Sequence, residues 1–170
     1  LAKITGLYCT EFIWQASSDF EKKDIESVFG CKYKIIIAPD LGVIHDEAKT
    51  SDNICPNFKN KDELKIVFLS RISSIKNLDG ALNILNSLSS LKGKVSYDIF
   101  GPIEDKDHWA LCMTLIDKIN KQQKSSVNYR GPISGELKTE ILSSYHLFFL
   151  PSKGEGFGHV ILEALSSGCP

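Results

Sequence analysis

A cluster of glycines near the end of the sequence could bring the backbone close to a ligand. Gly154, Gly156 and Gly158 fall between an apolar run at 146–150 and a segment with helical spacing that includes Val160. Glycine permits close backbone approach, and the first N–H groups of a helix have no partner inside the helix. A strand–loop–helix segment of this kind favours the binding of an anion.

Two carboxylates flank this loop and suggest that the ligand also carries hydroxyl groups. Glu155 lies in the loop, and Glu163 lies about a turn and a half into the helix that follows. A carboxylate accepts hydrogen bonds from sugar hydroxyls, whereas a bare phosphate would repel it. A structural interpretation remains open, with Glu155 as a helix cap and Glu163 as a solvated residue, because acidic side chains are common in first turns.

Two cations follow another predicted strand. The run at 64–69 is apolar, and Arg71 and Lys76 lie in the loop after it. Arginine and lysine near free helix amides suit a diphosphate, whose negative charge they compensate. Either residue alone is more often ordinary surface charge, and their shared position in the fold favours the binding interpretation.

The chain from residue 62 onward alternates between strand and helix patterns four times. This alternation predicts a parallel sheet with helices on both faces, which is half of a doubly wound, Rossmann-like α/β fold. The fourth strand is expected to be buried on both faces. The expected strands are 64–69, 95–100, 127–130 and 146–150, and the expected helices carry the stripes Leu78, Leu82, Leu85 and Leu88 (capped by Asn77), Trp109, Cys112, Met113, Ile116 and Ile119, Leu137, Ile141, Leu142 and Tyr145, and Val160, Ile161, Ala164 and Leu165.

This topology predicts where a ligand would bind. If the strand order is the common 3-2-1-4, the strands that end at Leu69 and Leu150 are neighbours where the winding reverses. Ligands bind at that point, beyond the carboxyl ends of the strands. The loop with Arg71 and Lys76 would then face the 154–158 loop across one crevice.

The first part of the chain has a separate pattern. A helix is predicted within 17–30, with a stop at Gly30, and a strand at 34–38. We expect 1–45 to be the remnant of a preceding domain and 46–61 to be a polar linker or surface loop. Residues 62–170 would then be an incomplete domain, truncated at the C-terminus.

Composition excludes several functional classes. An apolar content of 42% and a charged content of 24% are ordinary for a globular chain. The net charge of −1 argues against nucleic acid as a partner. Five cysteines without a C-x-x-C pair indicate reduced thiols, neither a zinc site nor a disulfide framework.

Three segments resemble motifs of the family 4 glycosyltransferases, which have the GT-B fold. Arg71, Lys76 and Asn77 are similar to the segment R-x-x-x-x-K-(G/N). Residues 155–163 resemble the E-G-F-G-x-x-x-x-E signature of retaining enzymes, and 163–170 the continuation E-A-(M/L)-A-x-G-x-P. The resemblance covers residues 62–170, while 17–45 resembles the last helix of the N-terminal domain and the crossing into the second. Departures are small: Ser70 stands where glycine is usual, and Asn77 where glycine is commoner.

The resemblance implies a role for each matching residue. Arg71 and Lys76 would hold the diphosphate of a nucleotide sugar and support its departure, with no metal and no further cofactor. Glu163 would bind the ribose hydroxyls. Glu155 would hold hydroxyls of the transferred sugar, and it would form the catalytic site together with Arg71 and Lys76.

Backbone groups would complete the donor site. Gly156, Phe157 and Gly158 would lie beside the transferred sugar. Gly131, Pro132 and Ile133 match the region that meets the base, mostly through the backbone. Arg130, directly before them, is equally well explained as a surface residue at a strand end.

The activity implied by the resemblance is transfer of a sugar from a nucleotide-diphosphate donor to a sugar or lipid-linked acceptor. The expected outcome is retention of anomeric configuration, in polysaccharide or glycoconjugate assembly. The acceptor would bind the missing N-terminal domain, so we expect the isolated fragment to be inactive. A cytoplasmic location is expected, with peripheral association at the inner membrane face as an option for the full-length protein.

Other functional classes can be compared with sugar transfer on the same residues. A sugar-nucleotide epimerase on the GT-B fold and a non-catalytic nucleotide-sugar-binding module both remain compatible with the residues. A dinucleotide-dependent oxidoreductase would need G-x-G-x-x-G after its first strand. Residues 70–75 occupy that position here and contain no glycine, which excludes this class.

Overall fold

A computed structural model describes residues 12–38, 62–88, 93–123, 125–155 and 158–170. The described residues divide into two compact units. The smaller comprises 12–38 together with Glu155 and Gly158, and the larger comprises 62–154 together with 159–170. The predicted linker at 46–61 lies outside the described residues.

The smaller unit is a β–α–β segment with two parallel strands. Strands β1 (Ile13–Ala16) and β2 (Lys34–Ile37) pair in register, with helix α1 (Asp19–Phe29) between them in sequence. Ser18 caps α1 by accepting from the backbone N–H of Glu21, and Gly30 ends it with a φ of 80°. The predicted helix and the predicted strand are confirmed, whereas β1 was not predicted.

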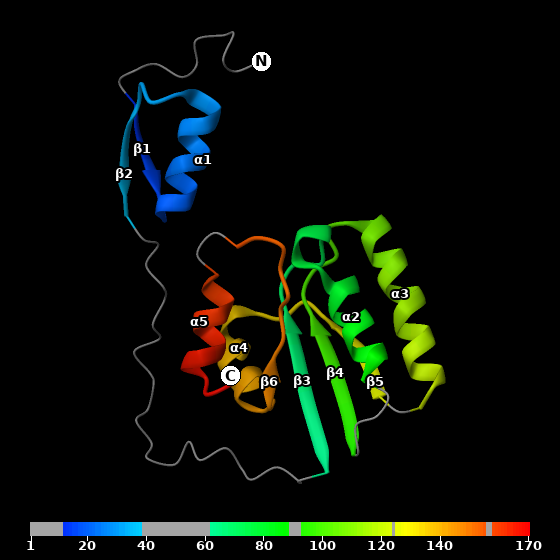
Figure 1. The fold of residues 1–170 in the computed structure, drawn as a ribbon. Helices are drawn as coiled ribbons and strands as arrows, with labels where there is room; N and C mark the ends of the chain where they lie inside the picture. The colour runs from blue at the N-terminus through cyan, green and yellow to red at the C-terminus, as the bar shows by residue number, and fades with distance from the viewer. Residues whose placement is uncertain (1–11, 39–61, 89–92, 124, 156–157) are drawn as a thin grey trace, which may run out of the picture. The chain divides into compact units, whose positions relative to one another are not determined.

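The larger unit is built on a four-stranded parallel sheet in the order β5-β4-β3-β6 (Figure 1). Counted from β3, this is the predicted order 3-2-1-4, so the doubly wound topology is confirmed. In chain order its elements are β3 (Glu63–Leu69), the 3-10 helix η1 (Ser74–Lys76), α2 (Leu78–Ser87), β4 (Lys94–Phe100), α3 (Lys106–Lys121), β5 (Ser125–Gly131), the 3-10 helix η2 (Gly135–Leu137), α4 (Lys138–Ser143), β6 (Leu147–Phe148) and α5 (His159–Ser166).

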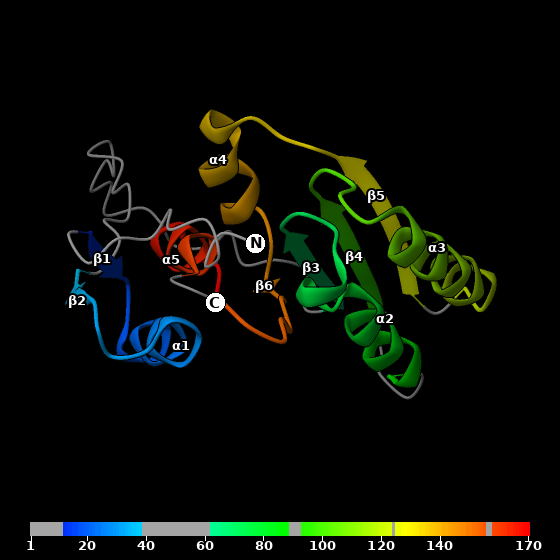
Figure 2. The same cartoon turned by 90° about the horizontal axis from the view of Figure 1, so that it is seen from above.

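Alternating side chains of β3 divide the core into two layers. Ile66 and Phe68 pack with residues of α2, α3, β4 and β5, whereas Val67 and Leu69 pack with α4 and α5. Figure 2 shows α2 and α3 on one side of the sheet and α4 and α5 on the other. The period-2 pattern of a parallel strand with both faces covered explains this division.

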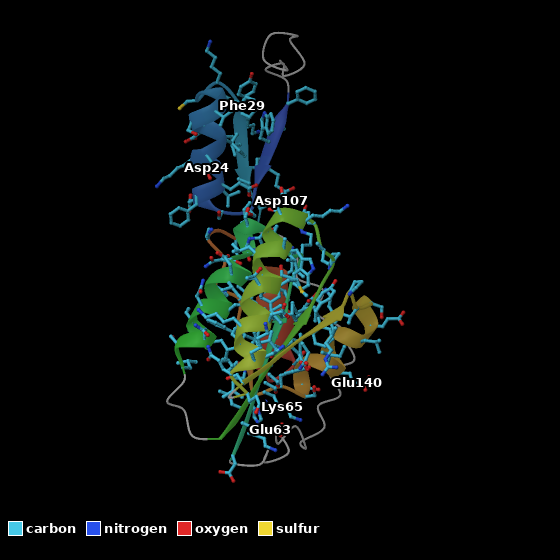
Figure 3. The ribbon with its side chains drawn as sticks, turned by 90° about the vertical axis from the view of Figure 1, so that its right-hand side faces the viewer. Asp24, Phe29, Glu63, Lys65, Asp107 and Glu140 are labelled. Carbon is cyan, nitrogen blue, oxygen red and sulfur yellow. The ribbon has the colours of Figure 1, made fainter. Side chains whose placement is uncertain are left out.

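The carboxyl ends of the strands meet at one edge of the sheet. Figure 3 shows Glu63 and Lys65 at the start of β3 and Asp107, in the first turn of α3, at the opposite end of the unit. Loops that leave β3, β4 and β5 at the Asp107 edge therefore lie at the position where the topology predicts a ligand.

The fourth strand differs from its prediction. Strand β6 covers only Leu147–Phe148, and the side chains of 147–150 are half-buried. It pairs with β3 alone among the described strands, through Ile66↔Leu147 and Val67↔Phe148. The expectation of burial on both faces was wrong because a strand with one neighbouring strand is covered less than a central one.

The helical stripes also differ in part from their prediction. Leu88 lies beyond the end of α2 and is exposed, and Ile161 and Leu165 of α5 are exposed as well. In α3 the buried residues are His108, Cys112, Ile116 and Ile119, while Met113 is 40% exposed. The predicted burial of Cys112, Ile116 and Ile119 is therefore confirmed, and that of Met113 was wrong. In the predicted 137–145 helix, Leu137 belongs to η2 and is exposed, and α4 ends before Tyr145. None of the helices in the described ranges combines the length and the apolar content required to span a bilayer.

We predict that Gly101→Ala strongly destabilises the chain. Gly101 has a φ of 139°, and a Cβ there would collide with the carbonyl oxygen of Ser70. Backbone strain and a clash with backbone together should cost about 3–5 kcal/mol of unfolding free energy. Gly135→Ala is the control, since no atom lies within 4 Å of its Cβ position, and it should change stability by less than about 0.5 kcal/mol. Urea unfolding measures both, and equal midpoints would contradict the close approach.

Candidate active site

Two loops are joined at the point where the winding of the sheet reverses. The backbone N–H of Lys153 donates to the carbonyl of Ile75 at 2.8 Å. The side chain of Asn77 donates to the carbonyl of Pro151 at 2.9 Å. The loop after β3 therefore contacts the start of the loop after β6, as the topology predicts. The two segments are hydrogen-bonded to each other here.

Asn77 does not cap α2 with its side chain as the sequence suggested. Its backbone is in the left-handed region, with φ 56° and ψ 39°, and its side chain makes no hydrogen bond to the helix. The amide instead bridges to Pro151. Asparagine tolerates the left-handed region better than most residues, which explains why it stands where glycine is commoner in the motif.

Arg71 lies in the loop directly after β3, with 63% of its side chain exposed. Its guanidinium donates to Glu104 at 2.9 Å, a partner that sequence reasoning missed. Glu104 is brought there by a bridge between Ile72 and Ile103. An exposed ion pair contributes only about 0–1 kcal/mol, so a bound anion can replace Glu104 at low cost.

Lys76 is the last residue of η1, half-buried, on the same loop as Arg71. Its two chain neighbours, Ile75 and Asn77, both form hydrogen bonds with the loop after β6. The structure thus fixes the backbone on either side of Lys76, which a diphosphate-binding lysine requires.

The segment predicted to meet a base begins where β5 ends. Gly131 has a φ of 82° and accepts a backbone hydrogen bond from Gly101 at 3.0 Å. Pro132 is exposed, and Ile133 packs against the apolar cluster of α4 and α5. These three residues therefore run from the end of β5 to the layer that carries Glu163.

Arg130 is bound to a buried carboxylate. Its guanidinium lies 3.3 Å from Oδ2 of Asp98, which also accepts from the hydroxyl of Tyr145 at 2.7 Å. Oδ1 of Asp98 accepts from the side chain of Asn128 at 2.8 Å. Burial raises the pKa of Tyr145 most, and the hydrogen bond to Asp98 raises it further. The hydroxyl of Tyr145 therefore stays protonated and acts as the donor. The sequence offered a signal in Asp98, the only acidic residue of β4.

Glu163 lies in the second turn of α5 and contacts a lysine of α4. The ammonium of Lys138 is 2.9 Å from one carboxylate oxygen and 3.0 Å from the other. Both side chains are about one-third exposed or less, at 33% and 28%. The purely solvated interpretation of Glu163 does not describe this contact, and sequence reasoning missed Lys138.

The remaining predicted residues lie in the glycine-rich loop. Glu155 is exposed, and Gly158 is buried with a φ of 71° directly before α5. Gly156 and Phe157 lie outside the described residues. The predicted helix start near Gly158 is confirmed, because α5 begins at His159.

Comparison with known proteins places the chain in a family. The model of the family "Glycosyl transferases group 1" matches residues 50–170, which include Arg71, Lys76 and Glu163. The chain belongs to this family.

Relatives of this group 1 glycosyl transferase are much longer than the chain. Sucrose synthase of Melioribacter roseus is 30% identical over 125 residues, a match that covers 65% of this chain and 16% of that protein. The chain therefore corresponds to only a part of this relative.

Solved structures share the fold at low sequence identity. HepE of Anabaena, in complex with UDP and glucose, aligns with a TM-score of 0.65 at 15% identity, over 99% of this chain and 45% of that one. A glycosyltransferase of Rickettsia africae aligns with a TM-score of 0.64 at 19% identity, over 91% and 42%. Sucrose-phosphate synthase of Thermosynechococcus elongatus gives 0.63 at 16% identity, over 93% and 39%. These likenesses confirm the predicted GT-B half.

One pair of aspartates in the chain has the Asp-x-Asp spacing that can hold a divalent ion against a diphosphate. The pair is Asp105 and Asp107 at the start of α3. Asp105 serves as the N-cap of α3, where its carboxylate accepts from the backbone N–H of His108 at 2.9 Å. Within the described ranges, no three His, Cys, Asp or Glu side chains are grouped as metal ligands.

We predict that Asn77→Ala destabilises the protein more than Asn77→Gly. Both variants lose the hydrogen bond to Pro151, but only alanine must also adopt the left-handed backbone. The alanine variant should lose about 2 kcal/mol of unfolding free energy and the glycine variant about 1 kcal/mol. Urea denaturation curves measure both losses. Equal losses would show that the backbone conformation at residue 77 carries no strain.

Proposed function

We propose that the protein transfers a sugar from a nucleotide-diphosphate donor to an acceptor, and that this chain supplies the donor site. The observation that carries the proposal is the joined pair of loops at the sheet edge, which fixes the backbone around Lys76 beside the segment that leads to the glycine-rich loop. Family membership and the UDP and glucose bound to HepE support a nucleotide-sugar donor.

The proposed chemistry follows from charge. Breaking the anomeric bond builds negative charge on the departing diphosphate and positive character on the sugar ring. Arg71, Lys76 and the N-terminus of α5 would stabilise the diphosphate, and one preorganised donor of this kind contributes roughly 3–4 kcal/mol. Arg71 would exchange its exposed partner Glu104 for the diphosphate.

Binding of the rest of the donor would use the layer of α4 and α5. Glu163 would accept from the ribose hydroxyls, and the backbone of Gly131, Pro132 and Ile133 would contact the base. Glu155 and the backbone of residues 156–158 would hold hydroxyls of the sugar. We infer retention of configuration from the E-x7-E spacing of Glu155 and Glu163.

The acceptor belongs to a part of the protein beyond this chain. We infer that the acceptor is a sugar or a lipid-linked sugar, that it binds an N-terminal domain, and that the chain alone transfers nothing. The proposed setting is polysaccharide or glycoconjugate assembly in the cytoplasm, with the full-length protein at the inner face of the membrane where the acceptor is lipid-linked.

Two variants of the full-length protein separate donor binding from sugar transfer. Lys76→Ala should weaken nucleoside-diphosphate binding and lower kcat about 100-fold or more, because the diphosphate carries charge before and after transfer. Glu155→Gln should leave nucleoside-diphosphate affinity within about twofold of wild type and lower kcat at least about tenfold, because it contacts only the sugar. Calorimetry gives the affinities, and product analysis with the tightest of the UDP-, GDP- and ADP-sugars gives kcat.

The matched control for Lys76 is Lys121→Ala, at the last turn of α3 and exposed. Its affinity and kcat should equal those of wild type. Loss of nucleotide binding in Glu155→Gln would contradict the placement of the sugar. An epimerised donor as the product would establish an epimerase, and tight binding without turnover would establish a binding module.

We further expect turnover of the full-length protein to survive saturating EDTA. Arg71 and Lys76 would supply the positive charge that a divalent ion supplies elsewhere, and Asp105 is engaged as a helix cap. Because these side chains would replace the metal ion, initial rates with and without EDTA should agree within about twofold. A loss of rate that is restored by added magnesium or manganese would contradict it.

A further inference from the structure

We propose that Lys138 is a positioning residue, which holds the carboxylate of Glu163 so that it selects a nucleotide with ribose hydroxyls. This inference rests on the proposed function, because it assigns a ribose to Glu163. Lys138 lies outside the sequence motifs at 71–77 and 155–170, which gave no signal for it.

The contact between the two side chains is close and symmetric. The ammonium lies 2.9 Å from Oε1 and 3.0 Å from Oε2 of Glu163, so it sits near the line that divides the carboxylate. A carboxylate offers about four lone-pair positions, and one lysine occupies one on each oxygen. The position left on each oxygen points outward, away from the lysine, so one of them can accept from a ribose hydroxyl.

The backbone positions behind both side chains are fixed. Lys138 opens α4, where Leu142 is fully buried, and the hydroxyl of Tyr145 just beyond the helix is bound to Asp98. Glu163 is followed in α5 by the buried Ala164. An ion pair between two anchored helices restricts the carboxylate to one orientation before a ligand arrives, which lowers the entropy cost of binding.

The place of this pair in the fold fits a ribose. Ile133, from the segment proposed to meet the base, packs in the same apolar cluster as Leu142 and Ala164. These two residues belong to the helices that carry Lys138 and Glu163. A ribose bonded to Glu163 would thus lie on the layer that the base segment also contacts.

Partial burial decides how strong the effect should be. With exposures of 33% and 28%, the pair is more shielded than the Arg71–Glu104 pair, at 63% and 49%. Water screens it less, and removal of Lys138 would leave a partly desolvated carboxylate without its donor. Glu163 would then turn toward water and lose the orientation that a ribose hydroxyl requires.

The test compares Lys138→Met, Lys138→Arg and Glu163→Gln in the full-length protein. Isothermal titration calorimetry measures binding of the tightest of UDP, GDP and ADP, of its 2′,3′-dideoxy counterpart, and of inorganic diphosphate. Lys138→Met should weaken the ribonucleotide about tenfold, the effect of about one charge-assisted hydrogen bond. Its affinity for the dideoxynucleotide and for inorganic diphosphate should stay within about twofold of wild type.

Further variants separate positioning from a merely structural tie. Lys138→Arg should restore ribonucleotide binding, because arginine also contacts both oxygens of a carboxylate. The double variant Lys138→Met with Glu163→Gln should bind no more weakly than Glu163→Gln alone, because the lysine acts through the glutamate. Lys118→Met, an exposed lysine of α3, is the control and should bind like wild type.

Three results would overturn the inference. Equal losses for ribonucleotide and dideoxynucleotide would show that Lys138 only ties α4 to α5. Tighter ribonucleotide binding by Lys138→Met would show that the ammonium competes with the hydroxyls. Unchanged binding, in a wild type that does prefer the ribonucleotide, would leave the proposed function intact and remove Lys138 from it. A wild type that binds no nucleotide would instead refute the proposed function, and this inference with it.

Discussion

The close approach of two backbones at Gly101 sets the edge of the sheet on which the site depends. A side chain at residue 101 would collide with the carbonyl of Ser70, so β3 and β4 end against each other only because glycine is there. Hydrogen bonds extend the contact from Phe100 to Ser70 and from Gly131 to Gly101. The carboxyl ends of β3, β4 and β5 are therefore held side by side, and the loops after them start at fixed positions. Without these contacts, the distance between the loop of Arg71 and residues 131–133 would not be defined.

Two of the charged residues singled out from the sequence have a partner from another element. Arg71 contacts Glu104 after β4, and Glu163 contacts Lys138 of α4. Exposure distinguishes the two pairs: the first is open to water and readily replaced, while the second is partly shielded and persistent. We infer that the first pair yields its cation to the diphosphate and the second keeps its carboxylate in place for the ribose. One pair is exchanged on binding and the other is retained.

Asp98 gives the layer of α4 and α5 its one strongly polar anchor among the buried residues of the described sheet. Its two oxygens accept from Asn128 and Tyr145 and pair with Arg130, so they connect β4, β5 and the turn before β6. A buried carboxylate is costly unless its hydrogen bonds are satisfied, and here both oxygens have donors. The same residues fix the end of α4 opposite Lys138. The electrostatics of this layer thus support the geometry of the proposed ribose contact.

Local pattern determined much of this protein. Apolar runs and helical spacing predicted the strands of the larger unit and the helices α2, α3 and α5, because side-chain periodicity reflects the backbone geometry of each element. The strand order followed from the common doubly wound topology. The positions of Arg71, Lys76 and Glu163 after predicted strands and in a predicted helix indicated a ligand site, and the resemblance to known motifs implied a role for each. Tertiary structure alone decided what depends on neighbours distant in sequence. His108 is inside and Met113 outside because helix packing sets the rotation of α3, and β6 is half-buried because it has one neighbouring strand. The amide of Asn77 bonds to Pro151, and the carboxylate of Glu163 to Lys138, across 74 and 25 residues. Such contacts arise only when the fold brings two segments together, so no local pattern encodes them.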